Sequence, residues 1–318
     1  MLHVAVLAEP DDTSLRLLEG RSGVRFAVGQ DVAVLTAEVP EAEAILYCTG
    51  GRERLEAAFQ RLPRLRWIHS RWAGLDALMF PALADSPVQL TNSRGVFSRT
   101  LAEFAIGAVL HFAKDFGRMR RQQAERRWEP FLVDEVHGRT LGILGFGDIG
   151  RAIAQRAKAM GMWILAMRRA SAPEDPLVDE GFAGPQRREL IARSDYVALA
   201  LPLTPETQGL FGAPEIAAMK PSAVLINVGR GPTVDEPALV TALQAGRLRG
   251  AALDVFAQEP LPEKSPLWSL DNVLLSPHTA DRTTTWLDEA MAMFLENLRR
   301  FRAGEPLLNV VEDKKRGY

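Results

Sequence analysis

The chain has 318 residues, of which 47% are hydrophobic and 25% charged, and its formal net charge is −2. This length is too great for one ordinary hydrophobic core, so we expect two domains, and the near-neutral charge provides no general attraction to nucleic acid or to anionic membranes. No apolar stretch approaches the roughly 18 residues of a membrane span, and the N-terminus lacks the basic segment of a signal peptide, so we expect a cytoplasmic protein. The single cysteine, Cys48, excludes an internal disulfide framework and a cysteine-based zinc site, and we expect no metal.

Short apolar runs alternate with helical patterns along almost the whole chain, which is typical of parallel α/β folds. In the N-terminal third we predict strands at residues 3–8, 24–28, 44–47, 67–69 and 88–91. Helical patterns fill the gaps between these runs, for example at 53–60.

Residues 99–128 show one long helical pattern with few helix breakers. Leu101, Phe104, Ala108 and Phe112 recur at three- and four-residue spacing along it. At about 1.5 Å per residue, such a helix would extend beyond one small domain. We therefore expect it to join the domains or to pack against a second subunit.

A second series of apolar runs begins at Thr140. It predicts strands at 140–144, 163–167, 196–201, 223–228, 251–255 and 273–276. The last helical pattern, 284–302, stops before Gly304 and Pro306. We place this helix back on the first domain, which makes that domain discontinuous: 1–98 plus 283–318, with a dinucleotide-binding domain at 99–282.

A glycine-rich segment follows the predicted strand 140–144 and precedes a predicted helix at 149–160. Gly145, Gly147 and Gly150 have the G-x-G-x-x-G spacing, in the strand–turn–helix context that a dinucleotide-binding turn requires. The first glycine permits the tight turn, the second allows close approach of a pyrophosphate, and the third lets the helix pack on the strand. The helix N-terminus then offers free N–H groups to the phosphates.

The next predicted strand ends in Arg168 and Arg169. A carboxylate at this place would hydrogen-bond the ribose of NAD(H), whereas guanidinium groups bind a 2′-phosphate in bidentate fashion. We expect NADP(H) to be preferred. The alternative is that both arginines are merely solvated and that NAD(H) serves as well.

Three polar residues follow predicted buried strands late in the chain: Arg230, Glu259 and His278. The carboxyl ends of parallel strands lie at one edge of a sheet, where ligands of α/β proteins bind. Such a set suits a 2-oxo acid: Arg230 binds its carboxylate, His278 exchanges a proton with its carbonyl oxygen, and Glu259 orients the imidazole and favours its charged form.

These residues lie in segments that resemble the D-isomer-specific 2-hydroxyacid dehydrogenases. The segments include G-F-G-D-I-G, N-V-G-R-G, A-A-L-D-V-F-A-Q-E-P-L and S-P-H-T-A, and the resemblance covers nearly the whole chain. It implies two Rossmann- or flavodoxin-like, doubly wound domains with the active site in the cleft between them. It also implies hydride transfer between NAD(P)H and a 2-oxo acid to give a D-2-hydroxy acid, and usually a homodimer formed through the long helix.

The resemblance further implies contacts for individual residues. The expected cofactor contacts are Gly145, Gly147, Asp148, Ile149, Gly150, Arg168, Arg169, Leu201, Pro202, Val228 and Asp254. Of these, Asp254 would lie near the nicotinamide carboxamide and Pro202 beside the adenine. The expected substrate contacts are Arg230, His278 and the backbone N–H groups of Arg71, Trp72, Ala73 and Gly74.

Some features depart from the family pattern and leave the substrate open. The residues after His278 are Thr279-Ala280-Asp281, without the glycine common in the family, and Trp72 and Trp286 are bulky. Glu259 replaces the glutamine of the formate dehydrogenases, which argues against formate. Glyoxylate, hydroxypyruvate and larger 2-oxo acids all stay open. Two other functions compete: a cofactor-sensing scaffold related to the corepressors of this family, and a reductase of another small carbonyl or inorganic compound.

Overall fold

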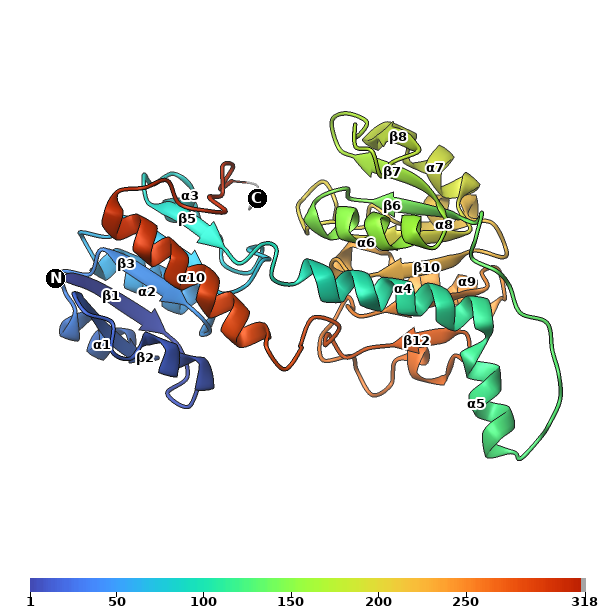
Figure 1. Ribbon diagram of the computed structural model, residues 1–318, viewed down its shortest axis with the longest axis horizontal. Helices are drawn as coiled ribbons and strands as arrows, with labels where there is room; N and C mark the ends of the chain where they lie inside the picture. The colour runs from blue at the N-terminus through green and yellow to red at the C-terminus, as the bar shows by residue number, and fades with distance from the viewer. Residues whose placement is uncertain (316–318) are drawn as a thin grey trace. The chain divides into compact units, whose positions relative to one another are not determined.

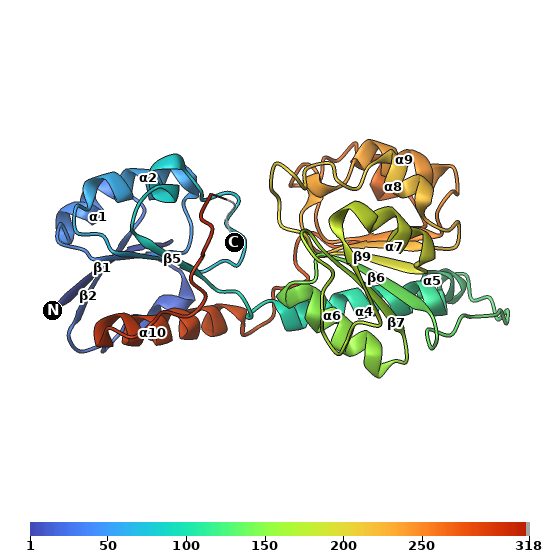
Figure 2. The same ribbon diagram turned by 90° about the horizontal axis from the view of Figure 1, so that it is seen from above.

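The computed structural model describes residues 1–315, and the chain divides into two compact units. Unit 1 contains Met1–Phe97 and the chain from Thr283 onward, and unit 2 contains Ser98–Arg282. Each unit has one parallel sheet with helices on both faces, as Figures 1 and 2 show. The predicted α/β class with two parallel sheets is therefore confirmed.

Unit 1 contains a five-stranded sheet with strand order β2-β1-β3-β4-β5. Its strands are β1 (Leu2–Leu7), β2 (Val24–Gly29), β3 (Ala44–Tyr47), β4 (Trp67–Ser70) and β5 (Gln89–Asn92). Its helices are α1 (Val32–Glu38), α2 (Gly51–Arg61), α3 (Pro81–Ala84), α10 (Trp286–Ala303) and the short 3₁₀ helix η1 (Thr13–Leu18). In Figure 2, α1 and α2 cover one face of this sheet and α10 covers the other.

An aromatic cluster fixes α10 to the sheet of unit 1. Trp67 of β4 stacks on Phe294 of α10 with ring centroids 5.4 Å apart, and His69 lies beside both rings. His69 is fully buried and its Nδ1 lies 2.7 Å from the Thr91 hydroxyl. Burial lowers the pKa of His69 to about 3, so the imidazole is a neutral part of the core. Burial also raises the pKa of the Cys48 thiol to about 12.

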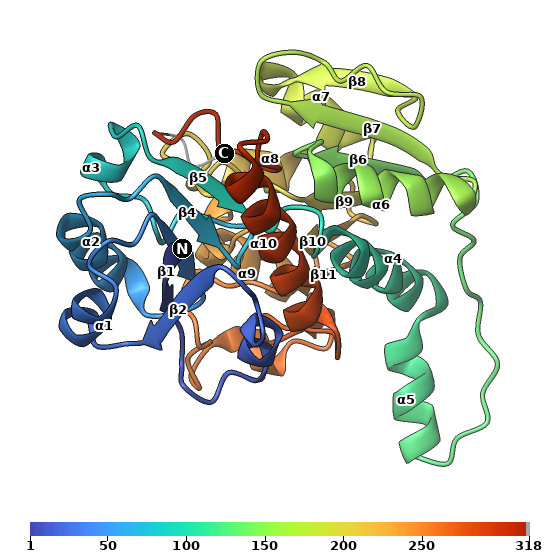
Figure 3. The ribbon, with the colours of Figure 1, turned by 60° about the vertical axis from the view of Figure 1, so that its left-hand side comes forward.

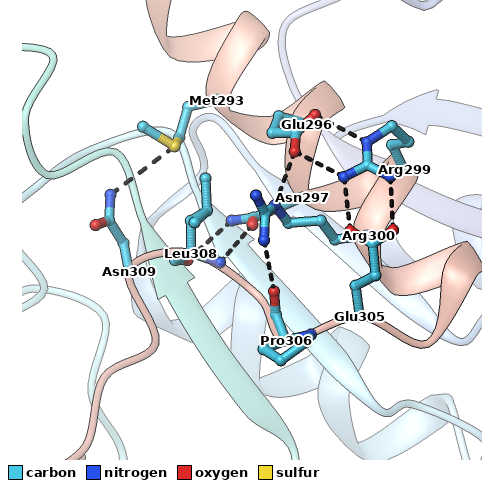
Figure 4. Close-up of polar contacts among 9 residues, drawn as sticks. All are labelled: Met293, Glu296, Asn297, Arg299, Arg300, Glu305, Pro306, Leu308 and Asn309. Atoms are coloured by element: carbon cyan, nitrogen blue, oxygen red, sulfur yellow. Dashed lines mark hydrogen bonds and ion pairs between the residues drawn. The ribbon is translucent and has the colours of Figure 1, made fainter.

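Two asparagines hold the segment after α10, one to α10 and one to β5, and Figure 4 shows the bonds of Asn297. The Asn297 side chain, fully buried on α10, donates to the Leu308 carbonyl at 3.0 Å and accepts from the Leu308 N–H at 2.7 Å. Asn309 donates to the carbonyls of Asn92 and Arg94. The chain as far as Val311 thereby pairs with β5.

Unit 2 contains a seven-stranded sheet with strand order β12-β11-β10-β9-β6-β7-β8. Its strands are β6 (Thr140–Leu144), β7 (Trp163–Arg168), β8 (Glu180–Ala183), β9 (Tyr196–Leu199), β10 (Val224–Asn227), β11 (Gly250–Leu253) and β12 (Val273–Leu275). Its α-helices are α4 (Ser98–Lys114), α5 (Phe116–Ala124), α6 (Asp148–Ala159), α7 (Arg187–Arg193), α8 (Ala213–Ala218) and α9 (Glu236–Gln244). Its short 3₁₀ helices are η2 (Gly184–Gln186), η3 (Gly231–Thr233) and η4 (Pro266–Ser269). Figure 2 shows α4 and α6 on one face of the sheet and α7, α8 and α9 on the other.

The prediction of one continuous helix over 99–128 is wrong. The helix breaks at Asp115, which adopts left-handed backbone (φ 52°) and caps α5 by accepting the Arg118 N–H at 3.1 Å. The second helix, α5, ends at Ala124, and the backbone of Arg126 is again left-handed (φ 53°). An aspartate can hydrogen-bond the backbone locally and so competes with helix continuation, which apolar spacing does not reveal. In Figure 3, α5 and the segment after it project away from the layers of unit 2.

The sequence pattern also misses β8. This four-residue strand, E-G-F-A, pairs only with β7 at the edge of the sheet and contains one fully buried apolar side chain, Phe182. An edge strand of this length leaves no run of apolar residues to recognise. No helix among residues 1–315 has the length and apolar character needed to cross a membrane.

The two hydrogen bonds between the buried Asn297 side chain and the Leu308 backbone provide a test of how the C-terminal segment stabilises unit 1. We expect Asn297→Ala to lower the free energy of unfolding by about 2–4 kcal/mol, because it leaves the N–H and the carbonyl of Leu308 without partners. Urea denaturation followed by tryptophan fluorescence measures the change. The control, Glu296→Gln, removes two surface ion pairs on the same helix, with Arg299 and Arg300, and should shift the midpoint far less. Equal shifts in the two variants would contradict this account.

Candidate functional site

Three adjacent strands of unit 2 end level at the carboxyl edge of the sheet. In the β-ladder, Asn227 at the end of β10 pairs with Leu253 at the end of β11, which in turn pairs with Leu275 at the end of β12. The loops that carry Arg230, Glu259 and His278 therefore start side by side. Parallel pairing with no register slip places them there.

Glu259 and His278 form a direct pair. The Oε2 atom of Glu259 lies 2.7 Å from Nδ1 of His278, and its Oε1 atom accepts the N–H of Phe256 at 2.9 Å. Because an ionised carboxylate only accepts hydrogen bonds, this pairing puts a proton on Nδ1. The His278 side chain is 41% exposed, and among residues 1–315 its Nε2 has no hydrogen-bond partner. The ring thus presents Nε2 outward.

His278 itself has an unusual backbone. Its φ is 51°, in the left-handed region that costs a non-glycine residue about 1–2 kcal/mol. The buried carboxylate of Asp254 compensates for this cost. Its Oδ1 accepts the hydroxyl of Ser276 at 2.5 Å and the backbone N–H groups of Thr279 and Ala280, each at 3.0 Å. These three bonds hold the chain on both sides of His278.

Asp281, three residues after His278, is a titratable group near the imidazole that the predicted site does not include. Burial raises the pKa of its carboxyl, and the charge of Asp254 adds to this effect, while the nearby His278 opposes it. The signal that could have identified it was a carboxylate in the same short loop as the histidine. From the sequence alone, Asp281 stands out only as a departure from the family pattern.

Arg230 lies in a loop that is stabilised by hydrogen bonds to the Arg230 backbone carbonyl. Its carbonyl accepts both the N–H and the hydroxyl of Thr233 as well as the Asn227 amide, and its guanidinium donates to the Gly229 carbonyl at 2.9 Å. A Cβ on Gly231 would lie 1.8 Å from the carbonyl oxygen of Phe256, so only glycine fits. The Arg230 loop is thereby packed against the loop that leads to Glu259.

The glycine-rich turn connects β6 to α6 as expected. Gly145 is left-handed (φ 98°), and a Cβ there would lie 2.5 Å from the Ala200 carbonyl oxygen. A Cβ on Gly150 would lie 2.3 Å from the Gly145 carbonyl oxygen, which explains why the third glycine is needed for close packing. Gly147 precedes α6 and has open space around its Cβ position. Together with the free N–H groups of the α6 N-terminus, this open space fits the approach of a pyrophosphate.

The other predicted cofactor residues of unit 2 surround this turn. Asp148 begins α6, where its carboxylate accepts the Ser98 hydroxyl, and Ile149 follows it. Leu201 is buried against the backbone of Gly229 and precedes the exposed Pro202, while Val228 is buried after β10.

Arg168 and Arg169 lie where β7 ends, next to the turn. The Arg168 Nε donates to the carbonyl of Phe146, within the glycine-rich turn, at 2.9 Å. Its two terminal nitrogens carry the remaining donors. The residues expected from the sequence for phosphate and 2′-phosphate binding thus share one end of the unit 2 sheet.

The predicted substrate segment, Arg71 to Gly74, belongs to unit 1 and follows β4. The N–H groups of Arg71 and Trp72 already donate within the unit, to Tyr47 and to the Ser70 hydroxyl. Among residues 1–315, those of Ala73 and Gly74 have no such acceptor. The structure therefore narrows the available donors of this segment to its second half.

The side chains of this segment form a compact cluster. The Arg71 guanidinium is 7% exposed, pairs with Asp12, and lies 5.7 Å and 5.6 Å from the rings of Trp72 and Trp286. The two indole rings are 5.1 Å apart. Since its charge is already neutralised by Asp12, the Arg71 side chain acts as an internal support for Trp72.

Comparison with known proteins places the chain in a family. Residues 106–280 match the family model described as D-isomer specific 2-hydroxyacid dehydrogenase, NAD binding domain. The chain is 37% identical over 265 residues to a glyoxylate reductase of Korarchaeum cryptofilum, covering 80% of this chain and 79% of the relative. It is 36% identical to glyoxylate/hydroxypyruvate reductase B of Citrobacter koseri, over 98% of this chain and 97% of the relative.

A solved structure extends the likeness to the fold. A D-isomer-specific 2-hydroxyacid dehydrogenase from Xanthobacter autotrophicus Py2, in complex with NADPH and MES, is 33% identical with a TM-score of 0.84, covering 99% of each chain. The family model alone spans more than half of the sequence, and the relatives span most of it. The chain therefore belongs to the D-isomer-specific 2-hydroxyacid dehydrogenase family and is an NAD(P)-dependent enzyme.

Proposed function

We propose that this enzyme reduces a small 2-oxo acid to the D-2-hydroxy acid and that it prefers NADPH. The pairing of Glu259 with His278 carries the proposal, because it holds Nδ1 and leaves Nε2 available at the sheet edge that also bears the glycine-rich turn. Glyoxylate and hydroxypyruvate are the first substrates to test, since they are named for relatives that match this chain over most of its length.

The proton chemistry belongs to His278. When bound, the reduced nicotinamide supplies a hydride to the carbonyl carbon, and negative charge develops on the carbonyl oxygen. The imidazolium donates its Nε2 proton to that oxygen, and Glu259 stabilises the positive charge of the ring before the proton is transferred. The balance is one hydride and one proton added across the C=O bond. In the reverse direction the neutral imidazole removes the hydroxyl proton.

The substrate carboxylate needs positive charge and N–H donors. We assign its anchoring to the Arg230 guanidinium, which also stabilises charge on the reacting oxygen. In unit 1, the N–H groups of Ala73 and Gly74 are the donors assigned to the substrate, with Arg71 and Trp72 supporting that segment.

The cofactor is assigned to the carboxyl edge of unit 2. Gly145, Gly147 and Gly150 with the α6 N-terminus, including Asp148 and Ile149, bind the pyrophosphate. Leu201, Pro202 and Val228 line the path of the cofactor, and Asp254 binds the nicotinamide carboxamide with the oxygen that the His278 loop does not use. Arg168 and Arg169 bind the 2′-phosphate.

The acid–base role of His278 has a direct test. We expect His278→Gln to lower kcat for glyoxylate reduction by at least about 100-fold while the dissociation constant for NADPH stays unchanged. His137→Gln, at an exposed histidine, is the matched control. Near-normal turnover in His278→Gln would refute the acid–base role of this histidine. If the wild-type protein reduces none of a panel of 2-oxo acids, that result would instead favour the cofactor-sensing scaffold function.

The cofactor preference depends on the arginines after β7. Arg168→Asp should lower the NADPH/NADH ratio of kcat/KM by roughly 10- to 100-fold, because a carboxylate repels the 2′-phosphate and accepts hydrogen bonds from a ribose hydroxyl. Steady-state kinetics with both cofactors measure the ratio. Arg247→Asp makes the same charge change on the segment after α9. A ratio that Arg168→Asp leaves unaltered would show that this arginine is merely solvated.

We also propose a homodimer formed through α5 and the segment that follows it. Trp128 and Leu132 are 96% and 99% exposed, and Phe116 and Met119 are 43% and 41% exposed. Large exposed apolar groups gathered on one projecting segment mark an interface. We therefore assign the interface to α5 and the segment that follows it, and not to the whole of the predicted long helix. The first helix, α4, is not available because it is buried against α6 and the sheet. A cytoplasmic location stays a prediction.

The dimer has a simple test. Light scattering after size-exclusion chromatography should give about twice the mass of one chain for the wild type. It should give the mass of one chain for Trp128→Glu combined with Leu132→Glu, because two buried charges would oppose association. Trp268→Glu, at a half-exposed tryptophan elsewhere in unit 2, should remain dimeric. A wild-type monomer at micromolar concentration would rule the interface out.

A further inference from the structure

A carboxylate lies in the loop that follows the two arginines assigned to the 2′-phosphate. Asp175, in the loop after β7, accepts Nε of Arg151 at 2.8 Å through Oδ2 and the Leu177 N–H at 3.0 Å through Oδ1. Its side chain is 15% exposed, whereas that of Arg151 is 54% exposed.

Two arginines, Arg151 and Arg168, act on the charge of Asp175, and both belong to elements that flank the glycine-rich turn. Arg151 is in the first turn of α6, and Arg168 is the last residue of β7. The Leu177 N–H bond lowers the pKa of Asp175, with further contributions from Arg151 and from the charge of Arg168. The carboxylate is therefore ionised at neutral pH and lies in the field of both guanidinium groups.

We propose that Asp175 is an internal counter-ion of the 2′-phosphate site and sets how strongly the enzyme prefers NADPH over NADH. This inference rests on the proposed binding of NADPH by Arg168. A bound 2′-phosphate carries a charge of about −1.5 to −2, so it repels Asp175 and competes with it for the attraction of the Arg168 guanidinium. A ribose hydroxyl is neutral, so the carboxylate weakens NADPH binding while it leaves NADH binding almost unaffected.

The neutral, isosteric variant isolates this charge. In Asp175→Asn, the amide oxygen can still accept the Leu177 N–H, so the loop keeps its main support. With one opposing charge removed, we expect the dissociation constant for 2′,5′-ADP to fall about fivefold and that for 5′-AMP to stay the same. Isothermal titration calorimetry with these two probes measures the 2′-phosphate contribution without turnover. The NADPH/NADH ratio of kcat/KM should rise by the same factor.

One control variant and the wild type itself separate this proposal from a structural role and from the proposed function. Glu174→Gln removes the same charge from the exposed neighbouring residue and should leave both dissociation constants unchanged. If Asp175 only orders the loop, Asp175→Asn weakens both probes together, and that result overturns the proposal. An unchanged preference for 2′,5′-ADP in Asp175→Asn, with a clear preference in the wild type, also overturns it. If the wild type itself binds the two probes equally, the NADP assignment fails first.

Discussion

The left-handed backbone of His278 depends on one buried oxygen atom, Oδ1 of Asp254. That atom accepts hydrogen bonds from Ser276, Thr279 and Ala280, which lie before and after the histidine. An isolated histidine would avoid this conformation, because its Cβ approaches the following carbonyl. Since the imidazole direction follows from the backbone, the contact between His278 and Glu259 depends on Asp254 as well. Asp254 thereby links the proposed binding of the nicotinamide carboxamide to the position of His278, the proposed proton donor.

A second constraint is the lack of space between the loops at this edge. Gly231 packs on the Phe256 carbonyl, Gly229 on the Leu201 backbone and Gly145 on the Ala200 carbonyl, each with no room for a Cβ. The loops after β6, β9, β10 and β11 are thus packed backbone against backbone. Such packing restricts the loop conformations more strongly than side-chain contacts do, because backbone atoms have no alternative rotamers. This rigidity is what a site that positions a proton donor and an anion-binding guanidinium requires.

Much of unit 2 could be predicted because its signals are local. Strands such as Ala223–Val228 are apolar runs between turn residues, and the glycine spacing lies between a strand and a helix, so each could be recognised within about ten residues. The misjudged helix over 99–128 shows the limit. Its apolar spacing continues past Asp115, but the side chain of that residue caps a new helix, and the spacing carries no trace of this local hydrogen bond. Likewise, β8 is defined by its pairing with β7 and not by its own composition.

Residue types and their order along the chain by themselves determined the parallel α/β class, the dinucleotide turn and the identity of the polar residues that follow β10, β11 and β12. These features depend on short-range patterns and on the rule that parallel strands end at one edge. Only the tertiary structure decided that Oε2 of Glu259 faces Nδ1 of His278, that the Arg71 guanidinium is neutralised by Asp12, and that Asp175 lies beside Arg151. Each of these contacts joins residues from different loops or elements. Their distances are set by strand register and by packing between loops, which no local stretch of sequence encodes.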